Sequence, residues 1–523
     1  LSLHDALPIL HIFKFMSDTS INNKRIAKNT LLLYFRMFFM MAITLYTSRV
    51  VLAALGVEDF GIYNVVGGVV AMMGILNGAM SVSTQRFLTF ELGKNDKIRL
   101  KQVFSISMSI YILFAIILVL LAETIGLWFL NTCLVIPSEK MEAANWVYQF
   151  SIISAIITLL YNPYNAMIIA HERMKIYAYV SVYEAILKLT VALLIQFLAD
   201  DRLFYYGLFL LIASFMVTLT YFIYSVRSFE EARYTFYWEK KLFNQLLSYS
   251  GWNMFGSISS LVKGQGLNIL LNLFFNPSVN AARGIAFQIN SAVSQFFTNF
   301  YTAVRPQITK YYAQDDIENM TKLVFRSSKF SFFLIMFISL PLIVEAPFVI
   351  KLWLGQIPEY VIPFMRLIIL ITAVDAMATP LMTTAHATGN IKLYQSVVGT
   401  LVMFNIPISY VALELGYSAV SVFYISLVIS IISLFLRLWI VNRLLDFPVI
   451  DYMKDVFGRC TLCSLLGAII PVLLASRLGT TFLSFCLVSI VSLFSSGLTI
   501  WSIGLNATER SQLLTIVKKK IKR

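Results

Sequence analysis

The chain has 523 residues, of which 59% are hydrophobic, and its mean hydropathy is +0.77. This composition excludes a soluble globular protein, because no soluble core of that size could bury so much apolar surface. The net charge of +14 does not indicate nucleic-acid binding, since the basic residues are scattered over many short loops rather than gathered on one face. We therefore predict an all-α, polytopic membrane protein.

The first residues do not resemble a targeting segment. The sequence begins with Leu1, and residues 1–15 lack the basic start, apolar stretch and small-residue cleavage site of a signal peptide. We therefore expect the native start at Met16 and treat residues 1–15 as a non-native addition to an N-terminal segment, 1–28.

Fourteen apolar segments follow, each near the roughly 20 residues that a transmembrane helix needs. We expect them at 29–55, 60–85, 102–130, 144–170, 175–199, 204–226, 243–275, 280–304, 324–354, 360–385, 391–413, 417–442, 459–476 and 480–505.

Basic residues alternate between the gaps that separate these segments. Of the 41 Lys and Arg, 28 fall in every second gap, and the other gaps hold only four. Those four are Lys140, Arg202, Lys351 and Arg477. Because cytoplasmic loops carry the excess of basic residues, both termini are predicted to be cytoplasmic.

Short motifs recur in the two halves of the chain. A Pro-containing span is followed by an Ala-His pair, first at Pro163 and His171 and again at Pro380 and His386. A Leu-Trp pair closes the third span of each half. We interpret this pattern as an internal repeat, although chance similarity of short motifs is the alternative.

The repeat divides the chain into an N-lobe at 29–226, a cytoplasmic linker at 227–242 and a C-lobe at 243–442. A further pair of spans at 459–505 and a basic cytoplasmic tail at 506–523 complete the predicted organisation. Because each lobe has six spans, both enter the membrane in the same orientation. Their pseudo-twofold axis should therefore lie along the membrane normal.

Motifs for catalysis or cofactor binding are nearly absent. Cys460 and Cys463 have redox or metal spacing, but they lie within a span without a second pair or a nearby histidine, so we favour a structural role. The sequence has no phosphate-binding loop of the P-loop type. We expect no enzyme activity, metal site or cofactor, and any active transport would depend on a gradient or the membrane potential.

Charges inside the predicted spans are costly in a bilayer and mark functional candidates. They are Arg36, Arg49, Glu123, Glu184, Lys188, Lys263, Arg283, Glu345, Arg366, Asp375 and Arg437. Seven are cations and four are acids, which favours an anionic passenger. Candidate ion-coupling groups are Glu123, Glu184 and Asp375.

Several of these charges also have a structural interpretation. Arg36, Arg366 and Arg437 can extend their side chains to an interface. Glu184 and Lys188 are four residues apart on one helical face and can neutralise each other. Glu123 and Glu345 lie near the external surface, where they can be helix-end groups instead of ion-coupling sites.

Three cations stand out as substrate-binding candidates, namely Arg49, Lys263 and Arg283, and we expect them to face a shared cavity. Uncharged polar residues in the spans 60–85, 243–275 and 280–304 are candidates for glycan contacts or for hydrogen bonds between helices. They are Asn64, Asn77, Gln265, Asn268, Gln288 and Asn290.

Several stretches resemble polysaccharide repeat-unit flippases of the Wzx type, from about residue 24 to 505. They are residues 47–51 (TSRVV), 55–63 (LGVEDFGIY), 83–87 (STQRF), 162–173 (NPYNAMIIAHER), 266–272 (GLNILLN) and 280–286 (NAARGIA). Their order and spacing are more specific than any single motif. That family is similar in architecture to multidrug exporters of the MATE type and to lipid II flippases.

The resemblance implies a two-lobed helix bundle in the bacterial cytoplasmic membrane. Its cargo would be an undecaprenyl-diphosphate-linked oligosaccharide for surface polysaccharide, moved to the external leaflet by alternating access. Arg and Lys suit the diphosphate, and Asn, Gln and Ser suit the glycan hydroxyls. Expected partners are this lipid-linked oligosaccharide, membrane lipids and other membrane proteins of polysaccharide assembly.

Two other functions compete with this one. A cation-coupled exporter of small amphipathic compounds would depend on an acidic residue in the first lobe. A membrane glycan polymerase or glycosyltransferase would need a large external loop or an acidic cytoplasmic site, yet the longest external gap is about Asn131 to Ala143.

Overall fold

The computed structural model describes residues 25–511 except for 27, 45, 48, 52, 57–58, 60–61, 64–65, 67–73, 133–135, 199–200, 276, 356, 480 and 508. Every regular element of these residues is a helix. The predicted non-native segment 1–15, Asn64 and most of the basic tail lie outside the described residues. The chain forms two compact units, unit 1 (Leu1–Ser257 and Thr302–Asp316) and unit 2 (Ile258–Tyr301 and Ile317–Arg523).

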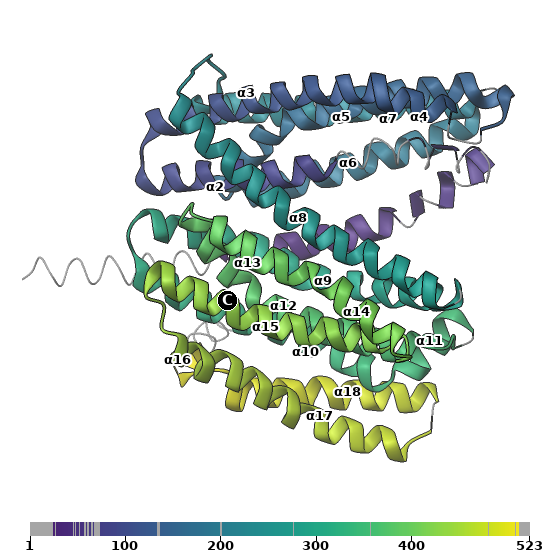
Figure 1. Cartoon of the computed structure of the whole chain (residues 1–523), viewed down its shortest axis with the longest axis vertical. Coiled ribbons are helices and arrows are strands. Elements are labelled where there is room, and N and C mark those ends of the chain that lie inside the picture. Colours follow the sequence, from purple (N-terminus) through teal and green to yellow (C-terminus); the bar gives the residue numbers. More distant parts are fainter. Residues whose placement is uncertain are drawn as a thin grey trace, which may run out of the picture. The chain divides into compact units, whose positions relative to one another are not determined.

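Unit 1 begins with a helix within Lys28–Gly56 and continues through α2 to α7 (Figure 1). Their bounds are α2 Gly74–Lys94, α3 Lys97–Leu121, α4 Leu127–Thr132, α5 Met141–Ala170, α6 Met174–Leu194 and α7 Arg202–Ser228. Helix α5 packs against α2, α3 and α7. Two long helices, α8 (Lys240–Phe274) and α9 (Pro277–Ala313), contribute residues to both units.

Unit 2 continues from α10 to α18. The bounds are α10 Ile317–Val344, α11 Ala346–Leu354, α12 Val361–Ala387, α13 Lys392–Met403, α14 Asn405–Glu414, α15 Ser421–Leu445, α16 Val449–Tyr452, α17 Arg459–Arg477 and α18 Phe482–Thr499. Helix α12 packs between α10 and α15, and α17 and α18 lie side by side (Figure 1).

A π-helical turn at Ala122–Gly126 joins α3 to α4. Such a turn leaves backbone groups without their usual partners, and the buried Tyr148 hydroxyl donates a 2.8 Å hydrogen bond to the Ala122 carbonyl. Only glycine fits at position 126, since a Cβ there would lie 2.0 Å from the Tyr148 hydroxyl. Gly126 and Tyr148 together therefore favour the π-helical turn that precedes Leu127 and Trp128.

Eleven helices of the described chain are long and apolar enough to cross a membrane. The expected spans that do not meet this criterion are the second, seventh and eighth, where the structure has α2, α8 and α9. These helices have 21, 35 and 37 residues, so they are long enough to span but less apolar. The chain is an all-α, multi-pass membrane protein, as predicted.

Two expected spans are each broken into two helices. Segment 324–354 divides into α10 and α11 at Glu345, and segment 391–413 divides into α13 and α14 near Phe404. Pro347 and Pro407 lie in the first turns of the second helices, where a missing N–H is tolerated. Proline therefore interrupts both segments, which hydropathy alone reads as continuous. The predicted lobe boundaries stay a prediction.

The surface of α18 illustrates a lipid-facing helix. Its exposed side chains are apolar and recur every three or four residues along one face. They include Leu483, Leu487, Ile490, Phe494 and Leu498, and Phe482 and Leu493 are exposed as well. The opposite face buries Ser484, Val488 and Ser492 against neighbouring helices, and this arrangement is the one expected of a helix in a bilayer.

Candidate functional site: the polar helices of unit 2

Helix α9 has a polar exposed face although its length is that of a membrane span. The exposed residues recur at helical spacing on one face, so they form a stripe. This α9 stripe comprises Gly284, Gln288, Ser291, Gln295 and Thr298. The stripe is uncovered at Gly284, because a Cβ built on this residue would meet no atom within 4 Å. Such a face is suited to water or a polar cargo rather than to lipid tails.

Arg283 joins α9 to α8 beside this stripe. Its guanidinium donates to the Asn268 side-chain oxygen at 3.1 Å and to the Gly264 carbonyl at 2.7 Å. It also lies over the Phe287 ring at 4.5 Å. These contacts orient the guanidinium and use part of its hydrogen-bonding capacity, so Arg283 has a structural role in addition to its charge.

Lys263 precedes Gly264 on α8 and, like Arg283, belongs to unit 2. Its ammonium is within electrostatic range of Asp375 and Arg437. Among the residues that the structure describes, none forms an ion pair with Lys263. The Asp375 carboxylate accepts a 2.6 Å hydrogen bond from Ser430 of α15. Unit 2 thus holds a charged cluster built from α8, α12 and α15.

The third predicted cation belongs to unit 1. Arg49 is exposed on the first helix, whereas the following residues Val50 and Val51 are buried in a cluster with Val191 and Ala213. Hydrophobic burial of that face leaves the guanidinium on the outside of the cluster. A cavity common to Arg49, Lys263 and Arg283 remains a prediction.

The predicted glycan contacts fall into two groups. Gln265 and Gln288 are exposed. Asn290 instead accepts a 2.8 Å hydrogen bond from Thr372 of α12, and Asn77 accepts one from Asn162 of α5. Together with Asn268, these asparagines take part in contacts between helices, which was the alternative interpretation of their sequence positions.

The predicted ion-coupling acids also differ in their surroundings. Glu123 is exposed in the π-helical turn and accepts a 3.2 Å hydrogen bond from Gln149. Glu184 forms an ion pair with Lys188 at 2.6 Å, as their spacing suggests. Asp375 is the partly buried acid of the charged cluster. Its position makes it the strongest of the three as an ion-coupling candidate.

Sequence reasoning missed a buried carboxylate, Glu172, in the turn between α5 and α6. One carboxylate oxygen accepts hydrogen bonds from Gln307 at 2.6 Å and Lys310 at 2.5 Å, and the other is 2.7 Å from Arg25. The side chain is 1% exposed, and the residue has a φ of +57°. Glu172 is part of the stretch 162–173, yet its partners are remote in sequence. We call these four residues the Glu172 cluster.

His171, which precedes Glu172, is also held in place. Its ring stacks on Phe229 with centroids 4.1 Å apart, and Nε2 lies 3.2 Å from the Glu231 carboxylate. Burial lowers the pKa of His171 below its ordinary value, and this effect exceeds that of Glu231. The imidazole is therefore neutral near pH 7, and the turn is fixed by packing more than by its charge.

Lys329, within α10, is 2% exposed and donates to Glu509 at 2.7 Å. The described residues contain no cluster of His, Cys, Asp and Glu that could hold a metal ion. Cys460, Cys463 and Cys486 are free thiols, in agreement with a structural role for the first two.

No protein-family model matches the chain, and no curated protein is similar to it in sequence. Solved structures do match. An outward-facing multidrug resistance MATE family transporter of the MOP superfamily has a TM-score of 0.70 and 14% identity, over 82% of this chain and 97% of that chain. A MATE structure in the bent conformation gives 0.70 and 14%, over 81% and 96%.

A MOP superfamily transporter from Pyrococcus furiosus, described as having a binding pocket of reverse polarity that suggests a different function, is also similar. Its TM-score is 0.66 and its identity 14%, over 79% of this chain and 96% of that chain. Agreement over nearly the whole length of these proteins is agreement in fold. The chain therefore has the fold of the MOP superfamily transporters.

Proposed function

We propose that the protein moves an undecaprenyl-diphosphate-linked oligosaccharide from the cytoplasmic to the external leaflet by alternating access, for surface polysaccharide synthesis. It would act in the bacterial cytoplasmic membrane with both termini in the cytoplasm. The α9 stripe carries this proposal, because its amide and hydroxyl side chains can exchange hydrogen bonds with glycan hydroxyls while a lipid tail stays in the bilayer.

Charge supports the same cargo. Arg283 lies beside the α9 stripe, Lys263 belongs to the charged cluster of unit 2, and Arg49 adds an exposed cation, so a diphosphate would find positive partners in a site of low dielectric. Gln265 and Gln288 would contact the sugars. Asp375 would respond to a coupling cation or proton, since its charge is balanced within the cluster of Lys263 and Arg437.

The test is a bacterial strain that lacks its own repeat-unit flippase and expresses this chain. Transfer is measured as the fraction of complete lipid-linked repeat units that become accessible to a membrane-impermeant glycosidase from outside. The combined variant Arg49→Gln, Lys263→Gln and Arg283→Gln should accumulate complete repeat units on the inner face. Undiminished transfer at equal membrane abundance would refute the assignment of these cations.

A second candidate is a cation-coupled exporter of small amphipathic compounds, which the similarity to MATE multidrug transporters favours. Under this hypothesis the chain confers drug tolerance that Asp375→Asn abolishes, and surface polysaccharide is unchanged when the chain is removed. Under the flippase hypothesis, removal of the chain leads to accumulation of lipid-linked repeat units, and drug tolerance stays the same.

A further inference from the structure

The segment between the two halves of the sequence has no regular secondary structure, and an exposed aromatic residue occupies every second position of it. Residues 234–239 form no helix and run from the short turn Glu230–Ala232 to the start of α8. Tyr234, Phe236 and Trp238 are 40%, 78% and 56% exposed. We call these three exposed residues the aromatic face of the segment.

The segment 234–239 is attached to α3 by hydrogen bonds. The Arg99 guanidinium donates to both carboxylate oxygens of Glu239, at 2.5 and 3.0 Å. The Thr235 N–H donates to the Ser105 hydroxyl at 3.4 Å. The hydrogen bonds that Arg99 and, to a smaller extent, Tyr237 donate to Glu239 lower the pKa of Glu239 to about 2. Its carboxylate is therefore ionised over the whole physiological range.

The attachment fixes the depth of the segment in a bilayer. Tyr234 lies 3.2 Å from the Ser109 hydroxyl, ten residues along α3 from Arg99, or about 15 Å of helix. The candidate span from Lys97 to Thr132 has 36 residues, about 54 Å, which exceeds the hydrocarbon thickness by about 12 Å at each end. On this placement Arg99 lies in the headgroup layer, and Ser109, about 18 Å from Lys97, lies about 6 Å inside the hydrocarbon boundary.

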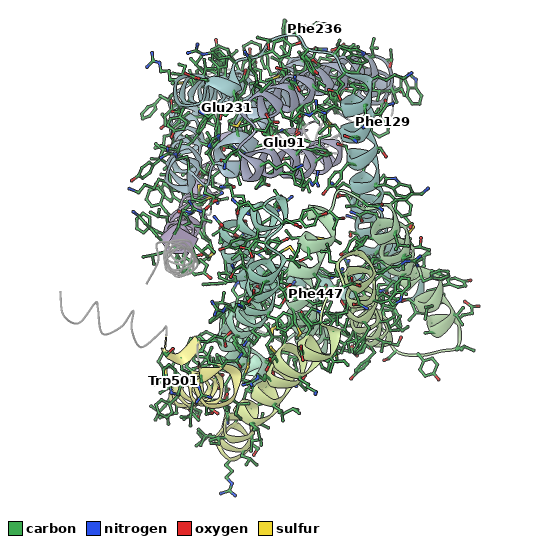
Figure 2. The ribbon with its side chains drawn as sticks, turned by 90° about the vertical axis from the view of Figure 1, so that its left-hand side faces the viewer. Glu91, Phe129, Glu231, Phe236, Phe447 and Trp501 are labelled. Carbon is green, nitrogen blue, oxygen red and sulfur yellow. The ribbon has the colours of Figure 1, made fainter. Side chains whose placement is uncertain are left out.

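The surroundings of the aromatic face also indicate lipid. Residues 103–108 of α3 are buried, whereas Ile112, Leu113 and Ile116, just beyond the segment, are exposed and apolar. The aromatic face continues this lipid-facing surface, and Figure 2 shows Phe236 at the outer margin of unit 1. The exposed cations Arg233, Lys240 and Lys241 flank it.

We propose that Tyr234, Phe236 and Trp238 insert into the headgroup layer of one leaflet and anchor the segment between the two halves to the membrane. Aromatic side chains with a polar edge favour this layer, and the flanking cations would attract anionic lipids such as phosphatidylglycerol. The segment is then a lipid-bound strap along α3 rather than a free loop. On the positive-inside topology its leaflet is the cytoplasmic one.

The experiment places a nitroxide label at Phe236→Cys or Trp238→Cys in the full chain, with the native cysteines replaced by serine. The protein is held in nanodiscs of phosphatidylcholine with phosphatidylglycerol. Lys94→Cys, at the exposed end of α2, is the aqueous reference, and Leu487→Cys on α18 is the hydrocarbon reference. Accessibility to oxygen and to a water-soluble nickel chelate gives the depth of each label.

Labels at 236 and 238 should lose access to the nickel chelate relative to position 94 and gain access to oxygen, with depths between the two references. Access to nickel equal to that at position 94 would overturn the anchor. Benzoylphenylalanine at position 236 then distinguishes the neighbours, since a lipid adduct supports the proposal and cross-linking to another protein or a second copy refutes it.

Discussion

Helices α9 and α18 show two ways in which a long helix can belong to this protein. The α9 stripe and the exposed residues of α18 both belong to unit 2. In each of them, exposed residues recur about every three or four positions. The exposed residues of α18 are leucine, isoleucine and phenylalanine, whereas the α9 stripe consists of glycine, glutamine, serine and threonine, and Ala281, Phe287 and Ala292 of α9 are exposed as well. The comparison teaches that the exposed face, rather than average hydropathy, distinguishes a lipid-facing helix from one that faces water or cargo.

The two helices are also stabilised differently. Helix α18 packs on α10 and α17, and its polar attachments lie on one short stretch, where the Ser495 hydroxyl donates a 2.9 Å hydrogen bond to the Gly467 carbonyl of α17 and the Cys463 thiol donates to the Thr499 carbonyl at 3.4 Å. Helix α9 has polar attachments along its length, at Arg283, at Asn290 and, near its end, at Gln307 and Lys310. Four experiments break or sharpen this contrast, beginning with the largest expected effect.

Glu172→Ala should destabilise the protein most, by about 3 to 5 kcal/mol, because Lys310 and Gln307 of α9 lose a buried carboxylate partner. Unfolding in nanodiscs measures the change. The matched control is Glu318→Ala, which removes an exposed partner of Lys322 on the surface of α10 and should leave the stability nearly unchanged. Equal effects at the two sites would contradict the role of burial.

A lysine placed on each exposed face should distinguish the helices directly. Ile490→Lys puts a charge on the lipid face of α18 and should cost about 2.5 to 3.5 kcal/mol, seen as lower abundance of inserted protein. Gln288→Lys on α9 should insert normally, since its face is not covered by lipid. If both variants insert equally well, the two faces have the same surroundings.

Making the α9 stripe apolar should affect transport rather than folding. Gln288→Leu combined with Gln295→Leu removes two hydrogen-bonding groups and should slow transfer of lipid-linked repeat units about tenfold, with an unchanged or higher unfolding temperature. Leu483→Ala with Leu487→Ala on α18 is the control, with normal transfer. A transfer rate equal to that of the parent protein would show that the α9 stripe does not contact the cargo.

Arg283→Gln should have the smallest effect on stability, about 1 kcal/mol, because hydrogen bonds to Asn268 and the Gly264 carbonyl are lost while the helices keep their other contacts. Arg283→Lys, which keeps the charge but not the two-point geometry, separates the roles. If Arg283→Lys transfers cargo as fast as the parent protein but loses as much stability as Arg283→Gln, the charge of Arg283 serves transport and its two hydrogen bonds serve the structure.

The sequence was sufficient for the features that depend on local pattern. Hydropathy indicated the helices, spacing indicated the Glu184–Lys188 ion pair, and polarity singled out α2, α8 and α9 before their exposed faces were known. Pro347 and Pro407 would also have indicated the two breaks, but averaging over a hydrophobic segment conceals a single proline.

Features that depend on distant partners could not be predicted in this way. The ligands of Glu172 on α9 lie 135 and 138 residues downstream, so no local pattern joins them. Asn268 and Asn290 have the same composition signal whether they contact sugar or a neighbouring helix, and only their hydrogen-bond partners decide between these roles.

The distance between Glu172 and Lys310 also has a consequence for biosynthesis. At about 5 to 20 residues per second, a ribosome needs about 7 to 28 s to make the 138 residues that separate them. During this interval Glu172 has been synthesised but its partners on α9 have not. Unit 1 can therefore acquire this ion pair only after synthesis has passed the middle of the chain and reached Lys310. We infer that membrane insertion of the first half precedes its final consolidation.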